Sequence, residues 1–182
     1  ITGKWDPIAG ATGYTIYRSE YNPSTKKWSK WLTLGTTGAT AKTFTDKTVK
    51  SGYEYKYTIR AVSGKFKSTY QDSNKLVYLA QPTLKISNVA NGIQGKWSQV
   101  NGATGYIIYR RELKDGKWSN WTSLGTTKST AKTFTDKTVK SGVTYKYTIR
   151  AKNGSYKSSY VASNQSVFLS VPTVKISNGI TG

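Results

Sequence analysis

The side chains that most often carry catalysis are scarce in this sequence. Its 182 residues include no histidine and no cysteine, which removes the usual general bases, thiol nucleophiles and soft metal ligands. Eight carboxylates remain, and two recur in matching stretches, as Glu20 and Glu112 and as Asp46 and Asp136. Asp46 is expected in an Asx turn, and Glu20 in a surface ion pair with Arg18. No two carboxylates are spaced as glycoside hydrolysis requires. Together with the lack of histidine and cysteine, this predicts no enzyme, no metal and no cofactor.

Two pairs of tryptophans are the better candidates for binding. Trp28 and Trp31 are three residues apart, and so are Trp118 and Trp121. On a continuous strand this spacing directs the two rings to opposite faces. A leucine six residues after the first tryptophan of each pair shares its parity, so the first ring is expected in the core and the second outside. An outward tryptophan beside lysines can stack on a sugar ring and favours an acidic ligand. The alternative is that it covers a sheet edge or packs on Lys or Arg stems.

A predicted hairpin supplies a second group of aromatic and basic side chains. The segments 64–67 and 154–157 each place an aromatic residue beside lysine at the tip of the hairpin, and loops of this kind often carry recognition. Tyr17 and Tyr109, on an earlier strand, have the same two interpretations as the outward tryptophans, a stacking platform for a ligand or packing within the protein. The candidate ligand-binding residues are Trp31, Trp121, Tyr17, Tyr109, Lys30, Lys65, Phe66, Lys67, Tyr156 and Lys157.

The elements that position these residues come in two copies. The segments 40–52 and 130–142 both read TAKTFTDKTVKSG, and PTLKISN at 82–88 returns as PTVKISN at 172–178. A unit of about ninety residues is large enough to form one modest core. The repeat is therefore expected to be a whole small domain rather than one turn of a solenoid.

Both copies are strongly basic. The net charge is +20, and each half of the chain contributes 14 basic side chains against five and three acidic ones. Such a surface attracts anionic polymers or acidic glycans, with an attraction that salt weakens, unless it is only a solvated lysine-rich surface. The basic residues match no nucleic-acid-binding motif, so nucleic acid is not the expected partner. No segment is apolar over the roughly 20 residues of a membrane helix, so membrane insertion is not expected.

Strand signals dominate each copy. Residues 53–61 alternate strictly between an apolar face with three tyrosines and a polar face with lysine and arginine. Ser63-Gly64, Asp115-Gly116 and Asn153-Gly154 predict hairpin turns. The second copy should form strands near 83–90, 93–99, 105–113, 117–125, 131–136, 143–152 and 155–169. Short strands separated by regular turns predict an antiparallel sandwich.

These patterns resemble a fibronectin type III domain. The pattern VxSGxxYxYxIxA at 49–61 and again at 139–151 is similar to the family's strand F, and GYxI at 13–16 and 105–108 to its strand C. The resemblance implies an all-β fold of two tandem antiparallel seven-stranded sandwiches. The first unit lacks its own A strand.

Single residues support the same resemblance. Trp5 and Trp97 fall where the family keeps a core tryptophan on strand B. Tyr55 and Tyr145 match the tyrosine corner, whose hydroxyl bonds to backbone a few residues upstream. The style of the repeats is similar to that of Gram-positive bacterial surface and secreted proteins, which implies an extracellular location.

The resemblance sets the expected domain boundaries and one expected contact. Residues 1–81 form the first repeat, 82–171 the second, and 172–182 the A strand of a truncated third. We expect this A-strand sequence to complete the first unit of another molecule in head-to-tail fashion, because an unpaired sheet edge is a template for strand addition. The predicted function is that of a non-catalytic extracellular module, a spacer and attachment domain with affinity for anionic cell-wall or host polymers. The alternative is a specific carbohydrate-binding or host-protein-binding adhesin that uses the outward aromatics.

Overall fold

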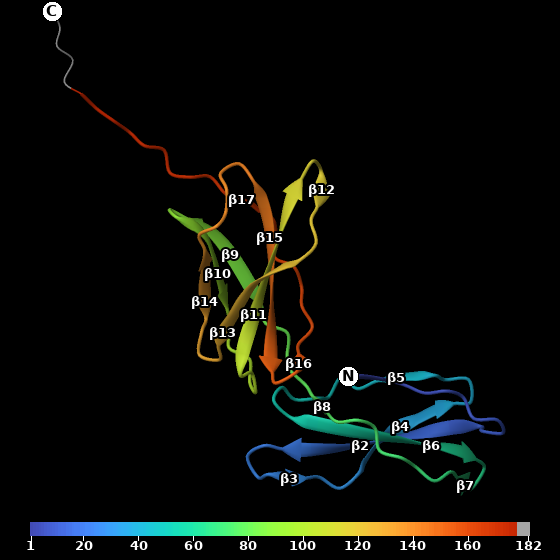
Figure 1. Ribbon diagram of the computed structural model, residues 1–182. Coiled ribbons are helices and arrows are strands. Elements are labelled where there is room, and N and C mark those ends of the chain that lie inside the picture. The colour runs from blue at the N-terminus through green and yellow to red at the C-terminus, as the bar shows by residue number, and fades with distance from the viewer. Residues whose placement is uncertain (178–182) are drawn as a thin grey trace, which may run out of the picture. The chain divides into compact units, whose positions relative to one another are not determined.

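The fold is all-β and antiparallel, as the sequence predicts (Figure 1). The computed structural model describes residues 1–177, and every regular element in that range is a strand. The described chain divides into two compact units, with Ile1–Gln81 in the first and most of the residues from Pro82 onward in the second. Each unit contains a small sheet and a six-stranded sheet.

In the first unit the small sheet has two strands, β1 (Thr2–Lys4) and β5 (Thr43–Thr45). The larger sheet is built around the long neighbours β2 (Gly13–Asn22) and β6 (Glu54–Ser63). Shorter strands flank them: β3 (Lys27–Trp28) and β4 (Leu32–Gly38) pair with β2, and β7 (Phe66–Lys67) and β8 (Leu76–Val77) pair with β6.

The second unit repeats this plan with one additional strand. Its small sheet has the order β14 (Thr133–Asp136), β10 (Gly92–Trp97), β9 (Leu84–Val89). Its larger sheet contains β11 (Gly105–Lys114), β12 (Lys117–Trp118), β13 (Thr122–Lys128), β15 (Thr144–Asn153), β16 (Tyr156–Lys157) and β17 (Ser166–Val167). Within the described part of the first unit no strand corresponds to β9, so the missing A strand is confirmed. Of the A strand expected at 172–182, residues 178–182 lie outside the described residues.

Alternating burial along the long strands builds the core. Tyr145, Tyr147, Ile149 and Ala151 on β15 are all at most 1% exposed, which confirms the predicted face. The Tyr145 hydroxyl accepts a hydrogen bond from the backbone N–H of Lys140 at 2.9 Å, the expected tyrosine corner. Tyr55 and Lys50 form the same contact at 2.7 Å in the first unit.

Two predicted strands, 117–125 and 155–169, are each interrupted in the structure, and serine side chains explain why. Ser119 donates its N–H to the carbonyl of Glu112 at 2.9 Å, while its Oγ accepts from the Glu112 N–H at 3.1 Å. The hydroxyl thus takes the place of a strand carbonyl, so the chain can leave the ladder with both backbone groups of Glu112 satisfied. The same double contact joins Ser158 to Ala151, Ser163 to Tyr147, Ser29 to Glu20, Ser68 to Ala61 and Ser73 to Tyr57.

The hairpin turns are confirmed, but the turns before β7 and β16 both differ from the prediction in register, and in the first of them Ser63 pairs with Phe66. Asp115 and Gly116 both have positive φ, 50° and 73°, as a two-residue turn of type I′ requires. In the turn before β16, however, Asn153 pairs with Tyr156, and Gly154 is the residue with positive φ (56°). The loop is therefore Gly154-Ser155, and Asn153 belongs to the strand.

Candidate functional site

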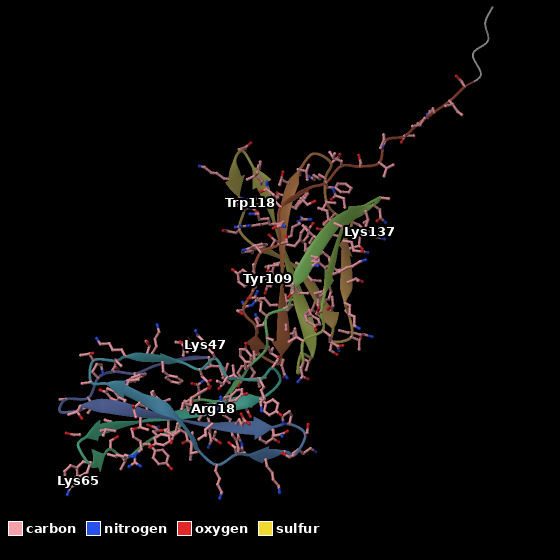
Figure 2. The ribbon with its side chains drawn as sticks, turned by 180° about the vertical axis from the view of Figure 1, so that it is seen from behind. Arg18, Lys47, Lys65, Tyr109, Trp118 and Lys137 are labelled. Carbon is pink, nitrogen blue, oxygen red and sulfur yellow. The ribbon has the colours of Figure 1, made fainter. Side chains whose placement is uncertain are left out.

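Aromatic and basic side chains contact one another in series on the outward face of each larger sheet. We call this series the aromatic–cation ladder. In the second unit it consists of Lys146, Trp118, Arg111, Trp121, Tyr160 and Arg150. In the first unit it consists of Lys75, Trp28, Lys56, Trp31, Tyr70 and Arg60. Figure 2 shows Trp118 and Tyr109 on one side of the second unit and Lys137 on the other.

In the second unit a guanidinium group joins the two tryptophans. Arg111 Cζ lies 4.9 Å from the ring centroid of Trp118 and 4.7 Å from that of Trp121. Lys146 Nζ lies 4.8 Å from the Trp118 centroid. These distances are within the range of cation–π attraction. Arg111 Nε is buried and has no hydrogen-bond partner among the described residues.

The second unit's ladder continues through Tyr160. Its ring meets Trp121 edge to face, with the centroids 6.2 Å apart and the planes at 79°. Arg150 Cζ lies 5.6 Å from the Tyr160 centroid. Lys146 and Arg150 share the outward face of β15, four residues and thus about 14 Å apart.

The first unit builds the same series with a lysine between the tryptophans. Lys56 Nζ lies 5.2 Å from the Trp28 centroid and 5.1 Å from that of Trp31. Trp31 meets Tyr70 at 6.2 Å, and Arg60 lies 5.9 Å from Tyr70. Lys56 also forms an ion pair of 2.7 Å with Asp72 (the second unit has an alanine, Ala162, at the matching position).

The cation between the tryptophans comes from a different strand in each unit. Arg111 is on β11, whereas Lys56 is on β6. The first unit has Ser19 in the place of Arg111, and its buried hydroxyl bonds to the carbonyl of Ser29 at 2.9 Å. Both units therefore place a cation between the two rings, although they use different residues to do so.

The structure corrects the predicted faces of the tryptophans. The interruption at residues 119–121 ends the alternation, so Trp118 and Trp121 contact the same guanidinium instead of facing opposite sides. Trp28 and Trp118 are half-buried rather than core residues, and Leu124, which shares the parity of Trp118, is 37% exposed. Trp31 and Trp121 each contact a basic side chain of the protein, as the alternative interpretation predicts.

The other predicted site residues are distributed over two places. Tyr17 and Tyr109 are half-buried on β2 and β11, and Lys30 is exposed beside Trp31. Lys65, Phe66 and Lys67 are exposed at the β6–β7 hairpin, with Phe66 70% exposed, while in the second unit Tyr156 is half-buried and Lys157 exposed. The structure therefore brings the tryptophans together with basic residues of β6 and β15, and the hairpin forms a separate surface. Sequence reasoning placed these basic residues outward but did not connect them to the rings.

The carboxylate of Asp136, which recurs as Asp46 in the first unit, accepts hydrogen bonds at both of its oxygens. Asp136 Oδ1 accepts hydrogen bonds from the N–H and hydroxyl of Thr138 at 2.9 and 2.7 Å, so the Asx turn is confirmed. Its Oδ2 accepts from Arg110 and from the Tyr147 hydroxyl, both at 2.9 Å. Burial raises the pKa of this carboxyl, but the hydrogen bonds from Thr138, Arg110 and Tyr147 outweigh it and lower the pKa below its ordinary value.

The first unit repeats this network around Asp46. Burial raises the pKa of Asp46, but hydrogen bonds from Thr48, Arg18 and Tyr57 outweigh it and bring the pKa to about 2. The expected ion pair of Arg18 with Glu20 is present, but it is not a surface pair, and Asp46 is the nearer partner. Arg18 is only 8% exposed and bonds Asp46 at 2.8 Å, whereas its distance to Glu20 is 3.4 Å. A carboxylate held ionised by four donated hydrogen bonds stabilises the fold and is poorly suited to act as a general acid.

Comparison with known proteins gives one match by sequence family and several by structure. Residues 81–166 match the family model described as the third fibronectin type III domain of SaeA. A two-domain fibronectin type III segment of chicken tenascin has 16% sequence identity and a TM-score of 0.47, with 92% of this chain and 97% of that one covered. The FN1–FN3 domains of chicken CNTN1 have 15% identity and a TM-score of 0.45, with 92% and 62% covered. No curated protein matches. Residues 1–177 contain no helix with the length and hydropathy that a membrane crossing requires.

Proposed function

We propose that this chain is a non-catalytic spacer and attachment module, built from fibronectin type III domains in tandem, that binds anionic polymers through the aromatic–cation ladder. Residues 81–166 match that family, and the first unit repeats their sequence and strand order. We place it outside the cell, on a bacterial surface or secreted, as the resemblance implies. Ten-residue strands give each unit a span of about 34 Å, which suits a spacer.

The observation that carries this proposal is the fixed order of cations along the ladder. Lysine and arginine side chains lose rotamer freedom when they bind a ligand. In the ladder, aromatic rings already hold Lys146, Arg111 and Arg150 in place, so part of that loss precedes binding. Anionic groups along a polymer would thus meet cations at set intervals.

The balance of charge outside the core supports the same partner. Arg18 pairs with Asp46 and Arg110 with Asp136 beneath the surface. Of the 28 basic and eight acidic side chains, 26 and six remain after these two pairs are set aside. The remaining excess attracts polyanions at long range, and the ladder supplies short-range contacts.

The second unit offers a clean test, because Asp72 has no acidic counterpart there. The double variant Lys146→Gln/Arg150→Gln removes two ladder cations. The control Lys137→Gln/Lys140→Gln removes two exposed lysines near the small sheet. Binding to a sulfated polysaccharide, teichoic acid, a neutral glycan and DNA is measured at low and at physiological salt. Each cation in contact with an anionic surface contributes about 1 kcal/mol, so the loss of two should make the ladder variant bind the polyanions about 30-fold more weakly than the control does.

Other results would favour other functions. Equal weakening in both variants would mean that the charge acts diffusely, and the proposed ladder site would be wrong. Binding of a neutral glycan that persists at physiological salt would favour the specific adhesin. That adhesin would use Trp31, Trp121, Tyr17 and Tyr109, although the chain's own cations already lie over both tryptophans. Preference for DNA would favour a nucleic-acid-binding protein.

A further inference from the structure

The cation at the centre of the ladder has an acidic partner in one unit and not in the other. In the first unit Lys56 lies between the two tryptophans, and its Nζ donates to Asp72 Oδ2 at 2.7 Å. In the second unit Arg111 lies between them. Within residues 1–177 neither Arg111 nor Lys146 forms an ion pair. The chain itself therefore neutralises the central cation of the first unit but not that of the second.

The main chain that carries Asp72 is anchored in the same way in both units. The carbonyl of the residue before Asp72 accepts a hydrogen bond from Thr58 Oγ1 at 3.0 Å, and the residue after it donates its N–H to the Tyr57 carbonyl at 2.8 Å. The matching bonds to β15 hold the residues on either side of Ala162 at 3.1 and 2.8 Å. Ala162 is therefore in the place of Asp72, with a methyl group where the first unit has a carboxylate.

Two cations contact the first tryptophan of each unit. In the first unit these are Lys56 and Lys75, and Asp72 offsets one of the two charges. In the second unit they are Arg111 and Lys146, and no acid in the described part of the chain pairs with either. Like charges held against one ring repel each other, and an anion that binds beside them offsets that repulsion.

Arg111 also has a hydrogen-bond donor that the protein leaves without an acceptor. Its Nε is buried and bonds to no atom of the described residues. A guanidinium is a planar fork of five N–H donors that matches two oxygens of a carboxylate, phosphate or sulfate. Since the ring centroids of Trp118 and Trp121 lie 4.9 and 4.7 Å from Arg111 Cζ, the orientation of the guanidinium is set before a ligand binds.

We propose that the second unit binds one oxyanion group beside Arg111 and Lys146, and that the carboxylate of Asp72 takes the corresponding place in the first unit. The group would be a sulfate, phosphate or carboxylate, because each presents two oxygens to a guanidinium. The inference rests on the proposed function, since the oxyanion would belong to the anionic polymer. It assigns the short-range contact to the second unit and makes Asp72 a built-in competitor that keeps the first unit from binding.

Exchanging the two residues tests this assignment in the whole chain. Asp72→Ala should free Lys56, so a sulfated polysaccharide should bind about fivefold more tightly than it binds the control Asp6→Ala, which removes the same charge from an exposed position. Ala162→Asp should pair with the central cation of the second unit and weaken binding about fivefold relative to Asn164→Asp, which adds the same charge at an exposed position nearby.

Small anions separate this site from the polymer. An NMR titration follows the Nε–H signal of Arg111, whose burial protects that proton from exchange with water. Sulfate, phosphate and acetate are each added at constant ionic strength, with chloride as the reference, so that the three arms rank the oxyanions. We expect at least one of them to shift the signal where chloride does not. The shift should be lost in Ala162→Asp and kept in Asn164→Asp.

The outcomes distinguish this inference from the proposed function. A signal that responds to the three oxyanions no more than to chloride, or that responds unchanged in Ala162→Asp, would overturn the oxyanion site. If the small anions shift the signal as expected but the polysaccharide does not bind, the site is supported and the proposed function is wrong. If the polysaccharide binds and both exchanges match their controls, the proposed function survives and the oxyanion site is wrong.

Discussion

Replacing the buried carboxylate of the second unit is the sharpest test of how the fold is stabilised. The Asp136 side chain is 2% exposed and accepts four hydrogen bonds. In Asp136→Asn, Oδ1 can still accept from Thr138, but the amide nitrogen meets the donors of Arg110 and Tyr147. The tyrosine hydroxyl can turn to accept, whereas the guanidinium cannot. A cation that is 19% exposed therefore loses its charged partner and keeps its bond to the Thr138 hydroxyl at 2.7 Å.

We expect Asp136→Asn to lower the free energy of unfolding of the second unit by about 3 kcal/mol, the lower end of the range for breaking a buried ion pair, because Arg110 keeps some contact with water. Hydrogen exchange of the β15 amides as a function of urea reports on this unit separately from the first. Asp115→Asn is the matched control. It makes the same change at an exposed turn whose positive φ asparagine tolerates, so its effect should stay within about 0.5 kcal/mol. A loss below about 1 kcal/mol in Asp136→Asn, or one equal to the control, would refute the assigned role.

Three further predictions concern the same architecture. The pKa of Asp46 falls from 3.8 to about 2 on folding, so its contribution to stability is present above about pH 4 and is lost as the pH falls toward 2. Urea titrations should show that the free energy of unfolding decreases by about 2 kcal/mol over this pH range, and that the decrease is smaller in Asp46→Asn. An unchanged decrease in that variant would contradict the assignment. Tyr145→Phe leaves the Lys140 N–H without its acceptor and should lower the free energy of unfolding by about 1–2 kcal/mol, measured by the same hydrogen-exchange experiment. An unchanged free energy of unfolding would count against a stabilising tyrosine corner. A Cβ at Gly95 would overlap the Phe134 ring, so Gly95→Ala should cost about 1–3 kcal/mol and alter the near-UV circular dichroism, whereas a neutral result would mean that the ring moves freely.

Much of the fold follows from short patterns in the sequence. Period-two alternation correctly predicts the buried face of β15, because one side of a strand must face the core. Asp115-Gly116 predicts its turn through the backbone conformation that glycine and aspartate tolerate. These signals are local, and local patterns determine which residues pair within a hairpin.

The candidate site could not be predicted in the same way. The position of Trp121 depends on Ser119, whose hydroxyl replaces a backbone carbonyl and ends the alternation on which the sequence argument relied. The partners of the tryptophans, Arg111 and Lys146, are on other strands and come together only in the folded sheet. The pairing of Arg110 with Asp136 likewise joins positions 26 residues apart. Such contacts depend on tertiary packing, which short local patterns in a sequence do not reveal.

The most direct test of the proposed function is the affinity of the whole chain for one sulfated polysaccharide at physiological salt, compared between Lys146→Gln/Arg150→Gln and Lys137→Gln/Lys140→Gln. Both variants lose the same charge, so their difference isolates the ladder from the long-range attraction. An ordered ladder predicts about 30-fold weaker binding for the first variant than for the second. Equal affinities would contradict a ladder site and leave only the diffuse attraction of a basic surface.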